Sequence, residues 1–193
     1  MKKLKVDRIS YFPPNNGYAV FLKENKSEKY LPILVGINEA HAISRALEGQ
    51  KIIRPMTHDL ITKIIENFES KVLKIIISSF KKGTFYAKII IFHRQIGEVI
   101  IDSRPSDAIA IALRTESPIF VEDYILKFAG IRENQNKIIN YKQIVSEELK
   151  EDEKEDSHMI DNLQSALNQA IIDEKYELAA KLRDKIKSLN IIK

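Results

Sequence analysis

The stretch from Asp102 to Arg114 brings together groups that could hold a phosphate and attack a phosphate ester. It opens with the run Asp102-Ser103-Arg104-Pro105-Ser106-Asp107 and continues almost entirely with Ala, Ile and Leu. Proline suits the first position of a helix, and the residue before a proline avoids the helical region. We therefore expect a strand to end near Asp102 and a helix to begin at Pro105. Such a corner presents free backbone N–H groups, which favour an anion.

Phosphodiester hydrolysis needs an activated water and neutralisation of the charge on the phosphate, often by metal ions held on carboxylates. The candidate catalytic residues are therefore Asp102, Asp107, Glu39 and His41. Asp102 and Asp107 are also the candidate ligands of a divalent metal ion, Mg²⁺ or Mn²⁺. The candidate contacts to nucleic-acid phosphates are Arg104, Arg45 and Ser106. We expect no organic cofactor.

Each candidate also has a purely structural interpretation. Asp107 falls in the first helical turn, where the helix dipole alone favours a carboxylate, and Asp59 can be explained in the same way. Arg104 could pair with Asp102 as a structural clamp instead of binding phosphate. His58 could serve as an acid or a base, but its position near a helix start favours a place on the surface.

The same corner occurs earlier in the chain. The aligned segments are residues 39–47 with 105–113, residues 33–35 with 99–101, and Gly17 with Gly83, all at an offset of 66 residues. A helix, a strand and a turn glycine that match at one spacing indicate an internal duplication. If the halves pack about a pseudo-two-fold axis, the corners at Glu39 and Asp107 could face one cleft. Packing could equally hold these corners far apart.

Each half of the duplication contains three expected strands followed by helices. The sequence therefore predicts an α+β fold, in which a duplicated three-strand-plus-helices unit forms a mainly antiparallel sheet. We place this domain at residues 1–135, with repeats at 4–69 and 70–130. Its Ile-rich strands and apolar helices have more apolar surface than one sheet with few helices can bury. Exposed apolar surface of this kind predicts a homo-oligomer, most simply a homodimer.

The last part of the chain differs in composition from the first. Residues 147–156 are almost all charged, so we assign residues 136–157 to a charged linker. Leu163, Leu167 and Ile171 then repeat at helical spacing, and a second set from Ala179 to Leu189 does the same. Residues 158–193 are therefore expected to form an α-helical hairpin that turns at residues 173–175. A hairpin of this size buries little alone, so we expect it to contact another protein.

The composition restricts the class of protein. Residues 1–135 carry 21 Lys and Arg against 15 Asp and Glu, a modest positive excess that permits a nucleic-acid partner without proving one. No apolar run approaches the ~20 residues of a membrane helix, so no membrane partner is expected. The absence of cysteine and of an apolar leader segment favours a cytoplasmic location.

Two families have sequence patterns that resemble this chain. Residues 31–49, 54–60, 83–87 and 102–110 resemble the bifunctional nuclease domain family, a match that covers roughly residues 1–130. His41 fills a position that varies in the pattern Glu-Ala-x-Ala-Ile-x-x-Ala-Leu-Glu-Gly, which this chain keeps from Glu39 to Gly49. Residues 166–184 resemble the UVR motif, a helical hairpin found in excision-repair nuclease subunits and in some stress-response adaptors.

These resemblances imply a nuclease that acts on DNA, RNA or both and contacts a protein partner through its C-terminal hairpin. They supply no agreed catalytic set, so the candidate residues above rest on the chemistry of their side chains. The alternative is a non-catalytic scaffold or regulator that recruits repair or stress-response partners through the hairpin. The absence of clustered acids at fixed spacing with a lysine favours this alternative.

Overall fold

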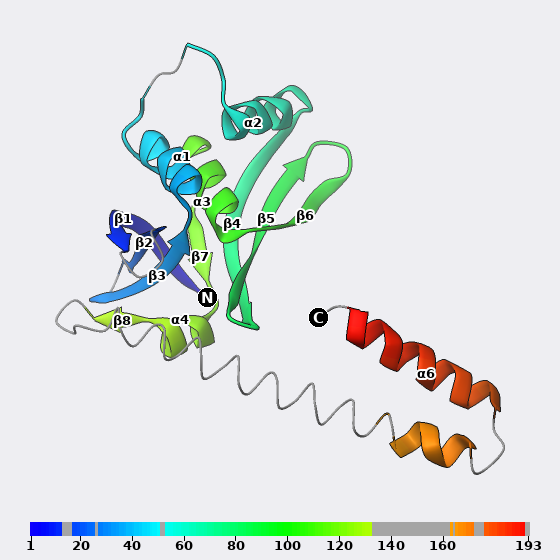
Figure 1. Ribbon diagram of the computed structural model, residues 1–193. Coiled ribbons are helices and arrows are strands. Elements are labelled where there is room, and N and C mark those ends of the chain that lie inside the picture. Colours follow the sequence, from blue (N-terminus) through cyan, green and yellow to red (C-terminus); the bar gives the residue numbers. More distant parts are fainter. Residues whose placement is uncertain are drawn as a thin grey trace. The chain divides into compact units, whose positions relative to one another are not determined.

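A computed structural model of the chain describes residues 1–12, 17–25, 27–50, 53–132, 163, 165–171 and 176–191. The described strands form one eight-stranded sheet in the order β6-β5-β4-β7-β1-β2-β3-β8 (Figure 1). The strands are β1 (Lys2–Phe12), β2 (Gly17–Glu24), β3 (Lys29–Val35), β4 (Ser70–Lys81), β5 (Thr84–His93), β6 (Gly97–Ser103), β7 (Ile119–Val121) and β8 (Ile131–Arg132). The helices with assigned bounds are α1 (Ile37–Leu47), α2 (Thr57–Asn67), α3 (Pro105–Arg114), α4 (Asp123–Ala129) and α6 (Tyr176–Ile191).

The sheet consists of two three-stranded meanders joined by the short strand β7, and β8 pairs with β3 at one edge. Strands β1–β2–β3 form one antiparallel meander, and β4–β5–β6 form the other. β7 pairs antiparallel with β1 and parallel with β4, so it closes the gap between the two meanders. Each meander is followed by a helix, α1 after β3 and α3 after β6. This arrangement confirms the predicted α+β fold with a duplicated unit and a mainly antiparallel sheet.

The third strand of each half and the helix after it repeat at a spacing of 68 residues, whereas α2 and α4 begin 66 residues apart, at Thr57 and Asp123. β3 and β6 begin 68 residues apart, at Lys29 and Gly97, and they end 68 residues apart, at Val35 and Ser103. α1 and α3 begin at Ile37 and Pro105, which gives the same spacing. For β3, β6, α1 and α3 the alignment at 66 residues was wrong by two residues, because helices rich in Ala and Ile match one another in more than one register.

The helices α1 and α3 pack against each other, and equivalent residues of the two helices are buried. At the spacing of 68, Ala42 corresponds to Ala110 and Ile43 to Ile111, and all four side chains are buried. Alanine lets two helix backbones approach closely, while each buried isoleucine contributes about 1.5–3 kcal/mol. Figure 1 shows the consequence, since α1 and α3 lie side by side with α2 next to the β4–β5–β6 meander.

Arg114, at the end of α3, joins α2 and α3 and also reaches α1. Its Nε donates to Asp59 Oδ1 of α2 at 2.6 Å, and its Nη1 donates to the carbonyl oxygens of Ala42 and Ala110 at 3.1 and 2.9 Å. The Arg114 side chain is only 9% exposed. Burial alone would raise the pKa of Asp59, but the hydrogen bonds from Arg114 and from the Met56 N–H hold it below its ordinary value of 3.8. Asp59 is therefore part of a structural ion pair.

We expect Asp59→Asn to lower the free energy of unfolding by about 1–3 kcal/mol at neutral pH, because a charged hydrogen bond to Arg114 is lost. The folded state lowers the pKa of Asp59, so this stabilisation is complete above the ordinary value of 3.8 and disappears as the pH falls through the lower folded value. Urea unfolding at several pH values measures the difference. Glu66→Gln, on the exposed part of α2, is the control and should change stability by less than ~0.5 kcal/mol. A deficit in Asp59→Asn that persists at the most acidic pH would contradict this interpretation.

The C-terminal part of the chain forms a separate compact unit, residues 143–193. Within its described residues, positions 163 and 165–171 are helical and are followed by α6. This helical pair confirms the predicted C-terminal fold, although Ile171, which we placed in the apolar seam, is 51% exposed. The linker at 136–157 and the turn at 173–175 lie outside the described residues. Across the described part of the chain, no helix combines the length and the apolar character needed to cross a membrane.

Candidate functional site

A pocket of about 590 Å³ lies where α1, α2 and α3 meet β5 and β6. One part of its lining is apolar and consists mainly of isoleucine side chains. The other part is polar and consists of Asn38, Glu39, Thr57, His58, Asp102, Ser103, Arg104 and Asp107. The pocket therefore contains carboxylates, a guanidinium and an imidazole beside an apolar wall.

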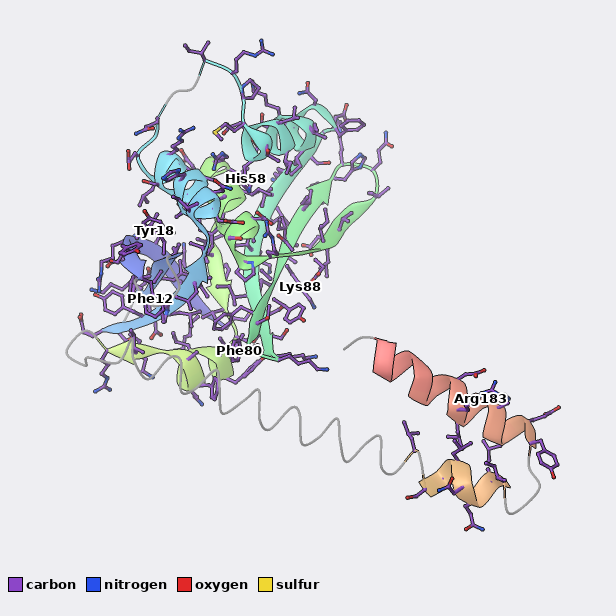
Figure 2. The ribbon with its side chains drawn as sticks, viewed as in Figure 1. Phe12, Tyr18, His58, Phe80, Lys88 and Arg183 are labelled. Carbon is purple, nitrogen blue, oxygen red and sulfur yellow. The ribbon has the colours of Figure 1, made fainter. Side chains whose placement is uncertain are left out.

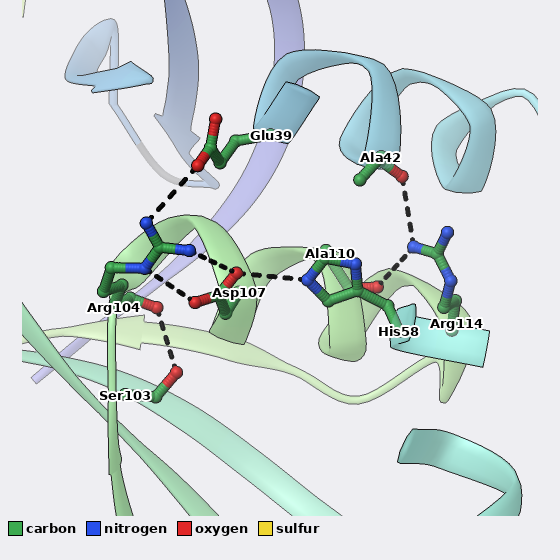
Figure 3. Close-up of polar contacts among 8 residues, drawn as sticks. All are labelled: Glu39, Ala42, His58, Ser103, Arg104, Asp107, Ala110 and Arg114. Carbon is green, nitrogen blue, oxygen red and sulfur yellow. Dashed lines mark hydrogen bonds and ion pairs between the residues drawn. The ribbon is translucent and has the colours of Figure 1, made fainter. Parts of the chain in front are cut away.

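Four of the polar side chains form a continuous chain of hydrogen bonds and ion pairs (Figure 3). Arg104 Nη1 donates to Glu39 Oε1 at 3.3 Å, and Arg104 Nε donates to Asp107 Oδ2 at 2.9 Å. Arg104 Nη2 also lies 3.3 Å from Asp107 Oδ1, so the Asp107 carboxylate is held at both oxygens. His58 Nε2 is 3.1 Å from Asp107 Oδ1. The order in space is Glu39–Arg104–Asp107–His58.

The positions of Glu39 and Asp107 follow from the duplication. Each is the third residue of its helix, Glu39 in α1 and Asp107 in α3, and carboxylates are favoured there by the helix dipole. The residue before α1 is Gly36, where an added Cβ would lie 2.6 Å from Glu39 Oε2. A glycine at this position leaves room for the Glu39 carboxylate to fold back over the helix start. The equivalent residue before α3 is Arg104, which has extended backbone angles (φ −67°, ψ 145°) as expected before a proline.

Exposure distinguishes the members of the chain. The side chain of Arg104 is 68% exposed, whereas those of Asp107 and His58 are 29% and 15% exposed. The hydrogen bond and the charge of Asp107, followed by the charge of Glu39, raise the pKa of Arg104 above its ordinary value. Each terminal nitrogen of Arg104 carries a second N–H that these contacts do not use. Arg104 can therefore donate to an anion that enters the pocket.

The structure gathers four of the predicted site residues in the pocket and leaves three outside its lining. Asp102, Asp107, Glu39 and Arg104 all line it. His41 is exposed on α1, Ser106 is 8% exposed, and Arg45 donates to Met56 Sδ at 2.9 Å. The suggested clamp between Arg104 and Asp102 is wrong, because Arg104 turns toward the equivalent first-turn acids of α1 and α3.

His58 is the residue that sequence reasoning misplaced. We expected it on the surface, but it is the second residue of α2 (Figure 2), and its largely buried side chain contacts Asp107 of α3 (Figure 3). The reason is that α2 covers the pocket, a placement that depends on the Asp59–Arg114 ion pair and on apolar packing. The local signal at Thr57-His58-Asp59 shows only a helix start, and it does not show which face of that helix meets α3.

The carboxylates of the pocket do not form a ready-made metal site. Among the residues that the structure describes, no group of three or more His, Asp or Glu side chains is arranged to hold a metal ion. Both oxygens of Asp107 accept hydrogen bonds from Arg104, which makes it a poor ligand. Asp102 is exposed at the end of β6 and lines the pocket, so it fits a ligand role better. The metal assignment remains a prediction.

The fold and the pocket define a class of small α+β domain with one polar site between two duplicated halves. Residues 20–134 match the bifunctional nuclease domain, and residues 158–192 match the UvrB/uvrC motif. The chain therefore belongs to the bifunctional nuclease domain family and carries a C-terminal UvrB/uvrC motif, as the sequence resemblance predicted.

Similar proteins agree with this family assignment. An uncharacterized protein of Mycobacterium tuberculosis is 39% identical over 131 residues, which cover 68% of this chain and 77% of that protein. Bifunctional nuclease 1 of Arabidopsis thaliana is 27% identical over 180 residues, which cover 87% of this chain and 55% of that protein. The bifunctional nuclease of Oryza minuta is 28% identical over 120 residues, which cover 60% of this chain and 36% of that protein.

The two arginines around α3 should behave differently when their charge is removed. We expect Arg104→Gln to change the free energy of unfolding by no more than ~1 kcal/mol, because its ion pairs are exposed. Arg114→Gln should cost about 2–4 kcal/mol, because it leaves Asp59 without its buried partner. Urea unfolding of both variants measures the contrast. Equal losses would show that Arg104 is as structural as Arg114.

Proposed function

We propose that this protein is a nuclease that hydrolyses phosphodiester bonds in DNA, RNA or both at the Glu39–Arg104–Asp107–His58 chain. The observation that supports the proposal is the contact of His58 with Asp107 beside an exposed arginine, inside the pocket of a bifunctional nuclease domain. The names of the plant relatives point to the same activity. The assignment of roles comes from the geometry.

Asp107 and His58 have the arrangement of an oriented acid–base pair. A carboxylate only accepts hydrogen bonds, so contact with Asp107 Oδ1 places the proton of neutral His58 on Nε2. Nδ1 then carries the lone pair, and none of the described residues hydrogen-bonds to it. In our proposal, His58 Nδ1 takes a proton from the attacking water, and Asp107 fixes the ring orientation and stabilises the positive charge that forms.

Arg104 is the group that we propose to bind the scissile phosphate. Its unused N–H groups can donate to the two non-bridging oxygens. The polar part of the pocket has three carboxylates for one guanidinium, so a phosphate entering it meets net negative charge. We therefore propose that a divalent ion, Mg²⁺ or Mn²⁺, arrives with the substrate at Asp102, since Mg²⁺ commonly uses one or two carboxylates together with substrate phosphates. Such an ion would supply neutralisation of the phosphate charge.

The two histidines of the helical region allow a matched test. We expect His58→Gln to reduce cleavage of single-stranded DNA and RNA by about a hundredfold or more, because it removes the base. The glutamine amide can still donate to Asp107, so the melting temperature should change little. His41→Gln is the control, because His41 is exposed and does not line the pocket. EDTA should abolish wild-type cleavage if the ion acts as proposed.

The opposite results would assign the protein to a different class. If wild-type protein cleaves neither substrate with Mg²⁺ or Mn²⁺, the nuclease proposal fails and the scaffold alternative takes its place. If cleavage occurs and His41→Gln abolishes it while His58→Gln does not, the nuclease stands and our role for His58 is wrong. Cleavage that is unchanged in EDTA would show that the divalent ion is not needed, and that part of the proposal would be wrong.

We also propose that the C-terminal hairpin binds a protein partner. Its described helices expose Ile171, Tyr176 and Leu178, which are 51%, 68% and 47% exposed. Exposed large apolar side chains on so small a unit are available for contact with another protein. Residues 158–192 match the UvrB/uvrC motif, which supports an interaction role for this unit.

A homodimer is our proposal for the assembly. Leu60 and Ile64 of α2 and Phe68 at its C-terminal cap recur every four residues and are 51%, 47% and 69% exposed. We expect light scattering to give a dimer mass at micromolar concentration, and we expect Ile64→Lys to shift it to a monomer. A monomer mass for the wild-type protein would refute the dimer, and a dimer mass for Ile64→Lys would place its interface elsewhere.

A further inference from the structure

We propose that the isoleucine-lined part of the pocket holds the base of one unstacked nucleotide while its phosphate lies at Arg104. This inference rests on the proposed function, because it names the substrate unit of the same site. It gives the protein a preference for single-stranded nucleic acid. It also assigns a binding role to the isoleucines of the pocket, which cannot act as acids, bases or ligands of a metal.

The apolar wall is built by isoleucines from four elements. They are Ile61 and Ile65 of α2, Ile89 and Ile91 of β5, Ile101 of β6 and Ile111 of α3. Ile89, Ile91 and Ile111 are nearly buried, at 5%, 7% and 3%, whereas Ile101 is 44% exposed at the sheet edge. These side chains leave an open space in a pocket of about 590 Å³, within the usual range for small-molecule sites.

The polar and apolar parts of the pocket are continuous along the chain. Ile101 is followed at once by Asp102 and Ser103, and then by Arg104 at the start of α3. A ligand that fills both parts must therefore combine a flat apolar group with an anionic group a short distance away. A nucleotide has this composition, since its base can bury both faces against aliphatic side chains and its phosphate can accept hydrogen bonds from Arg104.

The bases of a duplex cannot contact the isoleucines of the pocket while they remain paired and stacked. The faces of a paired base are covered by its neighbours, so only an unstacked base can enter a pocket of this kind. Inorganic phosphate or a sugar phosphate would occupy the polar part alone. The contribution of the base to binding is therefore the quantity that tests the inference.

The experiment compares adenosine 5′-monophosphate with ribose 5-phosphate, two ligands that differ only by the base. Their affinities for the full-length protein are measured by NMR titration with Mg²⁺, which requires no cleavage. Burial of the base against the aliphatic side chains adds apolar contact that ribose 5-phosphate lacks. We therefore expect the nucleotide to bind about tenfold more tightly, which corresponds to about 1.4 kcal/mol. Equal affinity of the two ligands for the wild-type protein would overturn the inference.

Two neighbouring residues of β6 provide the matched variants. Ile101→Trp should fill the apolar space and abolish the preference for the nucleotide, while leaving the affinity for ribose 5-phosphate within about twofold. Ile100→Trp is the control, because Ile100 is 62% exposed and does not line the pocket. If Ile101→Trp fails to fold, Ile101→Ser tests the same point by removing the apolar contact, and it should reduce the preference. A preference that survives in the folded Ile101 variant, or that is lost in Ile100→Trp, would overturn the inference.

The outcome is separable from that of the nuclease proposal. A tenfold preference for the nucleotide in a protein that cleaves nothing would support the base site and refute the nuclease. Cleavage by a protein that binds both ligands equally would support the nuclease and refute the base site.

Discussion

The guanidinium of Arg104 lies between two carboxylates that belong to equivalent helix starts, and the geometry of the site depends on this contact. Glu39 and Asp107 are both third residues of their helices, and each is favoured there by its own helix dipole. Two carboxylates held close together repel each other unless a cation separates them. Arg104 supplies that cation from the residue just before α3, and it also sets the position of the Asp107 oxygens that contact His58.

The two arginines at the ends of α3 differ in role: Arg114 stabilises the fold, and Arg104 is accessible to a ligand. Arg114 is buried, only 9% exposed, and donates to one carboxylate and two backbone carbonyls, so a ligand has little access to it. Arg104 has similar chemistry but lies at the mouth of the pocket with most of its surface in solvent. The first fixes α2 over the pocket, which brings His58 to Asp107. The second remains accessible to an anion.

The sequence predicts the local features of this site. It does not predict the contacts between residues that are far apart in the sequence, for physical reasons. Pro105 and the strand before it predict the corner that holds Asp102, Arg104 and Asp107, and the duplication points to the corner at Glu39 and His41 as its counterpart. The contact between the two corners depends on how α1 packs on α3, and this packing joins segments that lie far apart in the sequence. His58 could not be placed, because the side of α2 that faces the pocket is set by a side-chain pair 55 residues apart in sequence. For α1 and α3, the alignment at 66 residues failed for a related reason, since helix composition does not fix where a helix begins.

The three-residue strand β7 has a consequence for the order in which the chain can fold. Each meander is made of neighbouring strands, so both can form early from contacts that are short in sequence. The junction between them needs Ile119–Val121 to reach Lys2–Leu4 at the other end of the domain, which is a costly loop to close. During synthesis, a chain that lacks these three residues can hold two separate half-sheets but no continuous one. The shared pocket of α1, α2 and α3 is therefore among the last features that a growing chain can complete.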